Sequence, residues 1–125
     1  MTPEQIDALA ARLFGAIEAG DLEGCASCYS DDLVVWHNHD RREQRKDRNL
    51  EVLGWVIENV KDRHYDDIRR VVVADGFVQQ HVLRGTAHTG ERLDLPAMMR
   101  VWCDEGRITR IDEYLDSNQL RVLRV

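Results

Sequence analysis

The chain has 125 residues and lacks the features that mark membrane, secreted or repetitive proteins. No apolar run approaches the roughly 18 residues that a membrane-spanning helix needs. The N-terminal stretch MTPEQIDALA has neither the basic segment nor the apolar run of a signal peptide. No internal repeat, low-complexity tract or linker is found. The sequence therefore predicts a single domain over residues 1–125 and a cytoplasmic location.

Cysteine is scarce, and its three residues are Cys25, Cys28 and Cys103. An odd number argues against a disulfide framework. Cys25 and Cys28 have the C-x-x-C spacing of redox and zinc sites, but they lie within a helical pattern rather than between a strand and a helix. We therefore expect both to be buried as small apolar side chains.

Positive charge is also in deficit, because 17 Lys and Arg residues stand against 23 Asp and Glu residues and give a formal net charge of −6. An acidic surface repels nucleic acid and anionic lipid, so neither is expected as a partner. One basic cluster lies within residues 40–48, where Asp40, Glu43 and Asp47 interrupt it. We expect a solvated loop near the mouth of a pocket, where it could also act as a lid.

Helical signals dominate the first half of the chain. Thr2 and Gln5 have the spacing of a capping box, apolar residues follow at intervals of three and four, and Gly20 ends the pattern. Asp21 can cap a second, shorter helix. A strand over 33–38 and a third helix over roughly 47–62 follow.

In the second half, the apolar period changes to two, which is typical of strands. The pair DG at 75–76 predicts a tight hairpin. Four strands are predicted as a meander, over 64–74, 77–87, 93–103 and 107–115. This order predicts an α+β fold, in which a curved, mostly antiparallel sheet forms a cone with three helices on its concave side. A cone of this size can enclose a pocket at its wide end.

Three segments carry a resemblance to a known family: AGDLEG after the first helix, YSDDLVVW into the first strand and DEGRITRIDEYLD near the end. In this order they resemble the SnoaL-like and ketosteroid-isomerase-like branch of the nuclear transport factor 2 superfamily, over almost the whole chain. The resemblance implies a cystatin-like α+β barrel. It leaves the activity open, since this superfamily includes isomerases, cyclases, epoxide hydrolases, dehydratases and non-catalytic subunits.

The resemblance also allows the catalytic residues of known family reactions to be compared with the aligned residues of this chain. Ketosteroid isomerases use a Tyr and a protonated Asp as oxyanion donors and an Asp as base, and alignment on the quoted segments puts Leu13, Met98 and His37 at these three positions. Without donors where negative charge develops, we do not expect steroid isomerisation. Epoxide-hydrolase relatives use an Asp–Arg–Asp relay, but Trp102 stands where the carboxylate after Arg100 would be. The looser acid/base pattern of SnoaL-type polyketide cyclases accommodates the chain.

The same alignment, combined with strand alternation, predicts the site. It puts Arg100 and Glu113 on the cavity side of two neighbouring strands, with His37 facing them from the first strand. A His titrates near neutral pH, a carboxylate can orient it or activate water, and an Arg can hold a substrate oxygen. The candidate catalytic residues are His37, Arg100 and Glu113. The candidate substrate-binding residues are Trp36, Asn38, Trp55, Met98, Trp102 and Tyr114.

Structural roles for these residues stay open. Arg100 and Glu113 can pair with each other across adjacent strands. His37 can be a hydrogen-bonded structural histidine, and Trp36 and Trp102 can belong to the core or to a dimer interface.

Two further expectations concern partners and metals. The convex face of the sheet is expected to carry Leu95, Met99 and Val101 without a helix to cover them, which predicts a homodimer through this face. His37 and His39 share a strand face, but no recognised set of ligands accompanies them, so neither a metal nor a cofactor is expected.

The sequence thus predicts a small, moderately apolar ligand in the cone. It favours an acid/base reaction of isomerase, cyclase or epoxide-hydrolase type that uses His37 with Arg100 and Glu113. The alternative is a non-catalytic ligand-binding or dimeric assembly module of the same fold.

Overall fold

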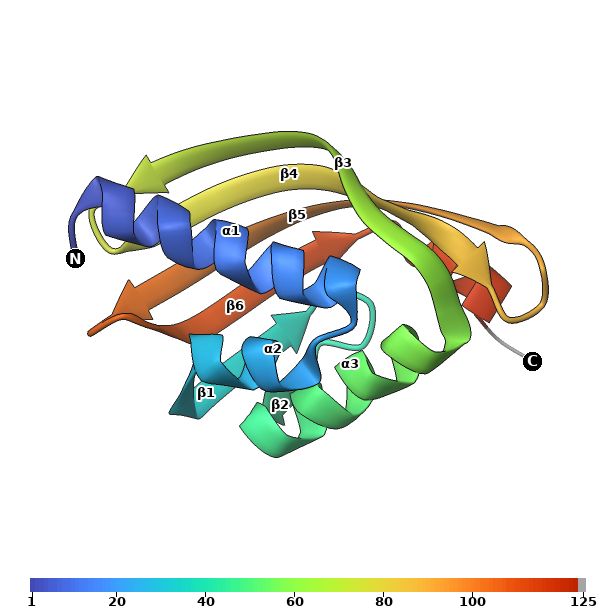
Figure 1. Ribbon diagram of the computed structural model, residues 1–125, viewed down its shortest axis with the longest axis horizontal. Helices are drawn as coiled ribbons and strands as arrows, with labels where there is room; N and C mark the ends of the chain where they lie inside the picture. The colour runs from blue at the N-terminus through green and yellow to red at the C-terminus, as the bar shows by residue number, and fades with distance from the viewer. Residues whose placement is uncertain (124–125) are drawn as a thin grey trace.

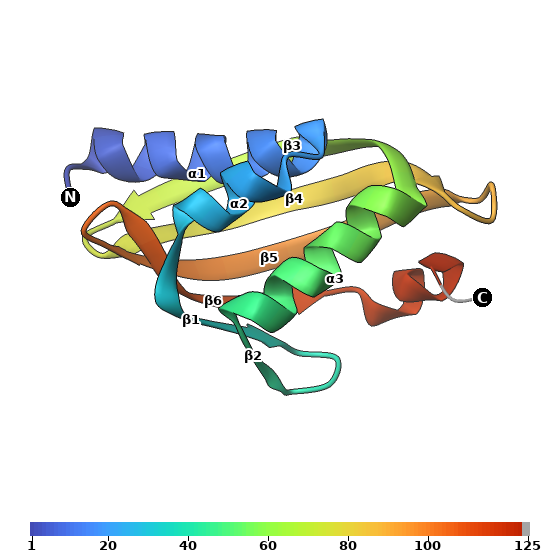
Figure 2. The ribbon, with the colours of Figure 1, turned by 60° about the horizontal axis from the view of Figure 1, so that its bottom comes forward.

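The computed structural model describes residues 1–123, and their helices and strands form one layer over another (Figures 1 and 2). The elements are α1 (Pro3–Ala19), α2 (Leu22–Cys28), β1 (Tyr29–His37), β2 (Glu43–Arg45), α3 (Lys46–Asn59), β3 (Val60–Val73), β4 (Gly76–Ala87), β5 (Arg92–Asp104), β6 (Arg107–Leu115) and the 3₁₀ helix η1 (Ser117–Leu123). No helix among the described residues is both long and apolar enough to span a membrane.

The six strands form one bent, unclosed sheet in the order β2-β1-β6-β5-β4-β3. Neighbouring strands run antiparallel, except β1 and β6, which are parallel. Helices α1, α2 and α3 lie over the concave side of this sheet (Figures 1 and 2). The predicted α+β fold with a curved, mostly antiparallel sheet is therefore confirmed.

The first helix follows its sequence signals closely. Thr2 accepts a hydrogen bond from the Gln5 amide at 3.1 Å, and the Gln5 side chain accepts one from the Thr2 amide at 2.8 Å. Gly20 ends the helix with φ 74°, a left-handed conformation that glycine adopts without steric cost. The predicted apolar stripe is buried over the sheet and consists of Ile6, Leu9, Ala10, Leu13, Phe14 and Ile17.

Cys25 and Cys28 on α2 are fully buried in the same core, as expected. Burial is the main cause that raises the pKa of the Cys25 thiol from 9.0 to about 11. A thiol with a raised pKa is a poor nucleophile, so its chemistry is that of a small apolar side chain.

Strand β1 begins at Tyr29, earlier than the predicted start at residue 33, and so includes the Ser-Asp-Asp segment 30–32, whose residue types favour a turn. Tyr29 pairs with Ile108 of β6, and an irregularity follows before the ladder resumes at Val34. Long-range pairing thus overrides the local turn preference of the Ser-Asp-Asp segment. The predicted loop over 40–48 is also partly ordered, since its residues form β2 and the first turn of α3.

The two faces of β5 are opposite to the prediction. Met99 and Val101 are buried under the helices, whereas Met98 is 44% exposed on the convex side. The cause is a β-bulge in the β5–β6 ladder, between the pairs formed by Trp102 and Cys103. Because one extra residue shifts the register by one, Met99 rather than Met98 lies opposite Glu113.

Arg63 at the start of β3 connects the ends of two helices. Its guanidinium donates to the carbonyls of Ile17 and Ile57 at 2.9 Å each, to that of Glu18 at 3.4 Å, and to that of Val60. Carbonyls at a helix C-terminus lack intrahelical donors and carry partial negative charge. Arg63 therefore holds α1 and α3 against the strand that follows them.

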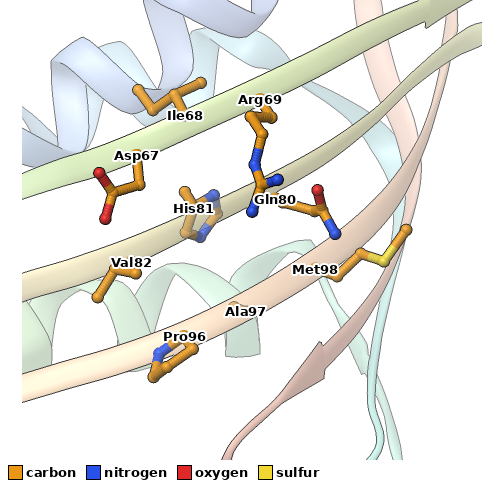
Figure 3. Close-up of a pocket in the computed structure, with 9 residues that line it drawn as sticks. All are labelled: Asp67, Ile68, Arg69, Gln80, His81, Val82, Pro96, Ala97 and Met98. Atoms are coloured by element: carbon orange, nitrogen blue, oxygen red, sulfur yellow. The ribbon is translucent and has the colours of Figure 1, made fainter.

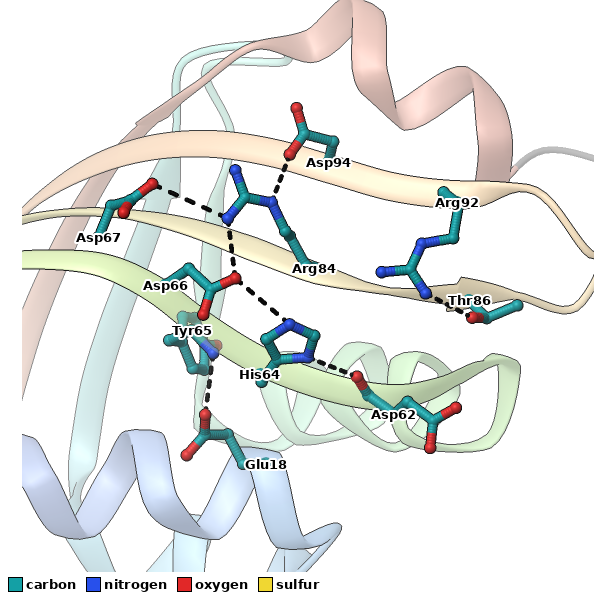
Figure 4. Close-up of polar contacts among 10 residues, drawn as sticks. All are labelled: Glu18, Asp62, His64, Tyr65, Asp66, Asp67, Arg84, Thr86, Arg92 and Asp94. Carbon is teal, nitrogen blue, oxygen red and sulfur yellow. Dashed lines mark hydrogen bonds and ion pairs between the residues drawn. The ribbon is translucent and has the colours of Figure 1, made fainter.

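A second polar network crosses the bend of the sheet (Figure 4). Arg84 on β4 donates to Asp66 on β3 and to Asp94 on β5 at 2.8 Å each, and Asp66 also lies 3.3 Å from His64. The hydrogen bond from Arg84 is the main cause that lowers the pKa of Asp66. The network lies beside a register shift after Asp66, so it fixes three strands where β3 bends.

Replacing Arg63 by Met should destabilise the fold, because the helix-terminal carbonyls lose a charged donor. We expect a loss of about 3 kcal/mol in the free energy of unfolding, measured by urea denaturation. Arg92→Met is the control, since exposed Arg92 makes one side-chain hydrogen bond, to Thr86 at 3.2 Å. Its expected loss is below about 0.5 kcal/mol. Equal losses in the two variants would contradict the role of Arg63.

Candidate functional site

A cavity of about 410 Å³ lies between the helices and the concave face of the sheet. Its wall is mostly apolar and comes from α1, α3, the central strands and η1. Representative apolar lining residues are Leu13, Phe14, Leu83, Leu95, Met99 and Leu120. Space of this size, lined in this way, suits a small molecule with an apolar body.

Two ionisable side chains meet inside this cavity. His37 ends β1 and lies directly opposite Glu113 in the parallel β1–β6 ladder. The His37 Nε2 atom is 3.0 Å from Oε1 of Glu113, and the two side chains are only 13% and 17% exposed. The structure thus brings together two of the three residues that the sequence predicts as catalytic.

The environment of His37 sets its protonation. Burial of the imidazole lowers its pKa, but the hydrogen bond and charge of Glu113, with a contribution from Asp40, outweigh burial and raise the net pKa above 6.5. A carboxylate oxygen only accepts, so Nε2 of His37 is the donor. The other ring nitrogen, Nδ1, is buried and has no partner among the described residues. It is therefore the nitrogen that can exchange a proton with a ligand.

Two tyrosines, Tyr29 and Tyr65, line the same cavity. Burial is the main cause that raises the pKa of both phenols, and the negative charge of Glu113 raises it further. Both phenols therefore keep their protons at neutral pH and can act as hydrogen-bond donors.

A buried polar chain supports the wall behind Tyr65. Arg70 donates to Asp7 at 2.8 Å and to Oε1 of Gln79 at 2.7 Å, and the Gln79 amide lies 2.8 Å from Nδ1 of His81. Because Oε1 of Gln79 is an acceptor, its amide donates to His81, and the ring proton of His81 lies on Nε2. Burial lowers the pKa of His81. Its neutral ring packs edge-on against Tyr65, with the ring centres 4.8 Å apart.

Arg100, the third predicted catalytic residue, lies outside the cavity. Its guanidinium stacks on Trp102, 4.4 Å from the ring centre, and pairs with Asp75. The register places Arg100 opposite Asp112, so it does not pair with Glu113 either. Because the extra residue of β6 shifts the β5–β6 register by one, Met98 and Trp102 lie on the convex side together with Arg100.

The other predicted ligand-binding residues are divided between cavity and exterior. Trp55 on α3 lines the cavity and is 41% exposed. Trp36 and Tyr114 pack against each other, with ring centres 5.3 Å apart, and Tyr114 is 57% exposed. Asn38 bonds both the amide and the carbonyl of Leu115, at 2.9 and 3.3 Å, and so closes the end of the β1–β6 pair.

Three polar lining residues have no clear signal in the sequence. The helical pattern of α2 continues through Tyr29, which hides its place at the start of a strand. Tyr65 precedes a break in the alternation of β3, where the register shifts. Asn49 lies near the start of the predicted third helix, where a polar side chain gives no sign of burial, although it is only 5% exposed.

Glu113→Gln removes the charge that holds a proton on His37. Burial then dominates, so we expect the pKa of His37 to fall below 6.5, measured by NMR titration of the imidazole resonances. The control is Glu43→Gln, because Glu43 pairs with Arg110 at 2.9 Å, outside the cavity. A pKa of His37 that is unchanged in Glu113→Gln would show that the carboxylate does not control the ring.

Solved structures support this architecture. A proposed polyketide cyclase from Xanthomonas campestris pv. campestris is 17% identical, with 93% of each chain covered and a TM-score of 0.81. PrhC from Penicillium brasilianum is 14% identical, with 99% of this chain and 95% of that chain covered and a TM-score of 0.83. AclR, a proposed hydroxylase from Streptomyces galilaeus, is 14% identical, with 99% and 88% covered and a TM-score of 0.85. At these identities the likeness establishes the fold alone.

Sequence comparison identifies the family. No curated protein sequence matches significantly. Residues 10–111 match the family model for the SnoaL-like domain, which is well over half of the chain. Together with the bent sheet and the helices over its concave side, this match shows that the chain belongs to the SnoaL-like family.

Proposed function

We propose that the cavity binds a small, moderately apolar molecule and that His37, paired with Glu113, transfers a proton to or from it. The observation that carries this proposal is the ionisable pair, at 3.0 Å, in a cavity whose wall is otherwise mostly apolar. Structural relatives named as a proposed polyketide cyclase, isomerase and hydroxylase share this fold and are consistent with chemistry in the cavity.

The pair can work in either direction of proton transfer. With its ring protonated, His37 donates from Nδ1 to a ligand oxygen, while Glu113 holds the ring in place and balances its charge. With its ring neutral, the same nitrogen accepts a proton from a carbon beside a carbonyl group. The phenols of Tyr29 and Tyr65 are donors for an oxygen on which negative charge develops. These steps belong to isomerase, cyclase and epoxide-hydrolase types of reaction, and they do not involve Arg100.

The convex face supports the second candidate, a dimeric assembly module. The residues predicted to make it apolar, Leu95, Met99 and Val101, are buried in the core instead. Other apolar side chains take their place, and the large exposed ones are Ile68, Val71, Met98 and Tyr114.

Figure 3 shows a hollow on this face that is lined by Ile68, Val82, Pro96 and Met98 together with Asp67 and Arg69. A surface that combines apolar side chains with both charges suits contact with a second copy about a two-fold axis. Dimerisation through this face is compatible with ligand binding in the cavity on the other side.

The catalytic proposal is tested with a panel of enolisable ketones and epoxides. We expect turnover by the wild-type protein and a loss of at least about a hundredfold in His37→Gln, since the proton carrier is removed. His64→Gln is the matched control, because His64 lies in the Arg84 network and not in the cavity. Turnover that survives in His37→Gln, or no turnover with any substrate, would contradict catalysis by His37 and favour a non-catalytic binding module.

Dimerisation is tested by placing a charge in the hollow of the convex face. We expect the wild-type protein to be a dimer in light scattering after size-exclusion chromatography, and Met98→Lys to be a monomer, because the interface would bury an unpaired ammonium group. The control is Ala11→Lys on the exposed side of α1. A wild-type monomer, or a dimer that persists in Met98→Lys, would rule out this interface.

A further inference from the structure

Two buried polar atoms point to the chemistry of the ligand. Within residues 1–123, Nδ1 of His37 and Oδ1 of Asn49 are the buried side-chain nitrogen and oxygen atoms without a hydrogen-bond partner. Both residues line the cavity. Burial of a polar atom without a partner is costly, so each position calls for a group that the chain itself does not supply.

Asn49 is an unusual residue for its position. It lies in the first turn of α3 and is the one residue of that helix that is buried, at 5% exposure. Neighbouring side chains of α3 on the cavity wall, Val52, Leu53 and Val56, are apolar. A leucine of similar size would pack here without leaving a polar atom unpaired. Asn49 is therefore costly for folding alone.

A hydrogen bond fixes the orientation of the Asn49 side chain. Its amide nitrogen donates to Oε1 of Gln44 at 3.1 Å. Gln44 in turn lies opposite Val35 in the β1–β2 ladder. The other edge of the Asn49 amide, with Oδ1, is the edge left for a ligand.

Asn49 and His37 lie at the same end of the cavity. His37 is two residues after Val35, so it shares the inner face of β1 with the residue that Gln44 faces. Other parts of the wall are apolar and include Leu13, Leu83 and Leu93. The cavity therefore combines these two polar positions with apolar surface, as an amphipathic ligand requires.

A hydroxyl group on the ligand can satisfy both unpaired atoms. Oδ1 of Asn49 needs a donor, and a protonated His37 offers one, so a group that both donates and accepts satisfies both. A carboxylate cannot donate and would face Glu113 and Asp40, which also line this end. Arg48 at the cavity wall is already paired with Glu51 at 3.0 Å, and a cationic amine would face protonated His37.

We propose that Asn49 is a specificity-determining residue that accepts a hydrogen bond from a hydroxyl group of an otherwise apolar ligand. This inference rests on the proposed binding of a small apolar molecule in the cavity, and it adds the class of ligand. The hydroxyl is held between Asn49 and His37, with the apolar body of the ligand among the apolar side chains.

The experiment compares two probes of nearly equal shape, 2-naphthol and 2-methylnaphthalene, in which a methyl group replaces the hydroxyl. Their dissociation constants are measured by ¹H–¹⁵N NMR titration with the wild-type protein and with Asn49→Leu. We expect the wild type to bind 2-naphthol about tenfold more tightly than 2-methylnaphthalene. In Asn49→Leu this ratio should fall to near one, without weaker binding of 2-methylnaphthalene.

Two further variants make the test specific. Asn59→Leu is the same substitution at the other end of α3, where Asn59 bonds the Trp55 carbonyl at 2.8 Å, and it should keep the preference. Asn49→Asp retains acceptor oxygens and should also keep it, which provides a test that does not depend on the folding of Asn49→Leu. Loss of the preference in Asn49→Asp would contradict the inference.

The outcomes separate the two proposals. Equal binding of both probes by the wild type, or a preference that persists in Asn49→Leu, would overturn the role of Asn49 and leave ligand binding in the cavity intact. Binding of neither probe would overturn the proposed apolar ligand and, with it, the role of Asn49.

Discussion

The parallel pairing of β1 with β6 is the constraint on which the site depends. It is the one parallel contact in the sheet of the described chain, and its register sets His37 directly opposite Glu113. Side chains that face each other on neighbouring strands come within hydrogen-bond distance only in a fixed register. Asn38 is the residue after β1, and its side chain bonds both the amide and the carbonyl of Leu115 at the end of β6. These bonds fix the register of the two strands next to His37 and Glu113.

The pair is costly for stability, which is why its position is informative. Moving two charges out of water carries a large penalty, and their mutual attraction repays it only with good geometry. Apolar residues of similar size would fill the space with less penalty. The fold supports the pair with structure that has no role in chemistry: Arg63 holds two helices over the cavity, and Arg84 fixes the bend of the sheet beneath it.

Much of the fold follows from local signals in the sequence. The capping box at Thr2 and Gln5, the left-handed Gly20 and the DG hairpin act within a few residues, so they could be predicted. Strand β2 could not, because its three polar residues form a strand only by pairing with β1. Long-range contacts decide such short edge strands.

The site was predictable only in part, for a related reason. His37 and Glu113 could be inferred because the family resemblance aligns them with cavity positions and the alternation of β1 after Val34 and of the end of β6 is regular. Arg100 could not be placed, since one extra residue in β6, Thr109, shifts the β5–β6 register and so changes which residues of β5 share a face with Glu113. Asn49 could not be found either, because its burial depends on how α3 packs against β2. Each error comes from the way neighbouring elements pack and pair, which the local pattern of residues does not specify.

The most direct measurement is a crystal structure of the protein with a ligand retained through purification or soaked into the crystal. We expect electron density inside the cavity, with a ligand oxygen within hydrogen-bond distance of Nδ1 of His37. Density confined to the convex face, or a cavity closed by its own side chains with the His37–Glu113 pair turned toward solvent, would contradict a functional centre at this pair.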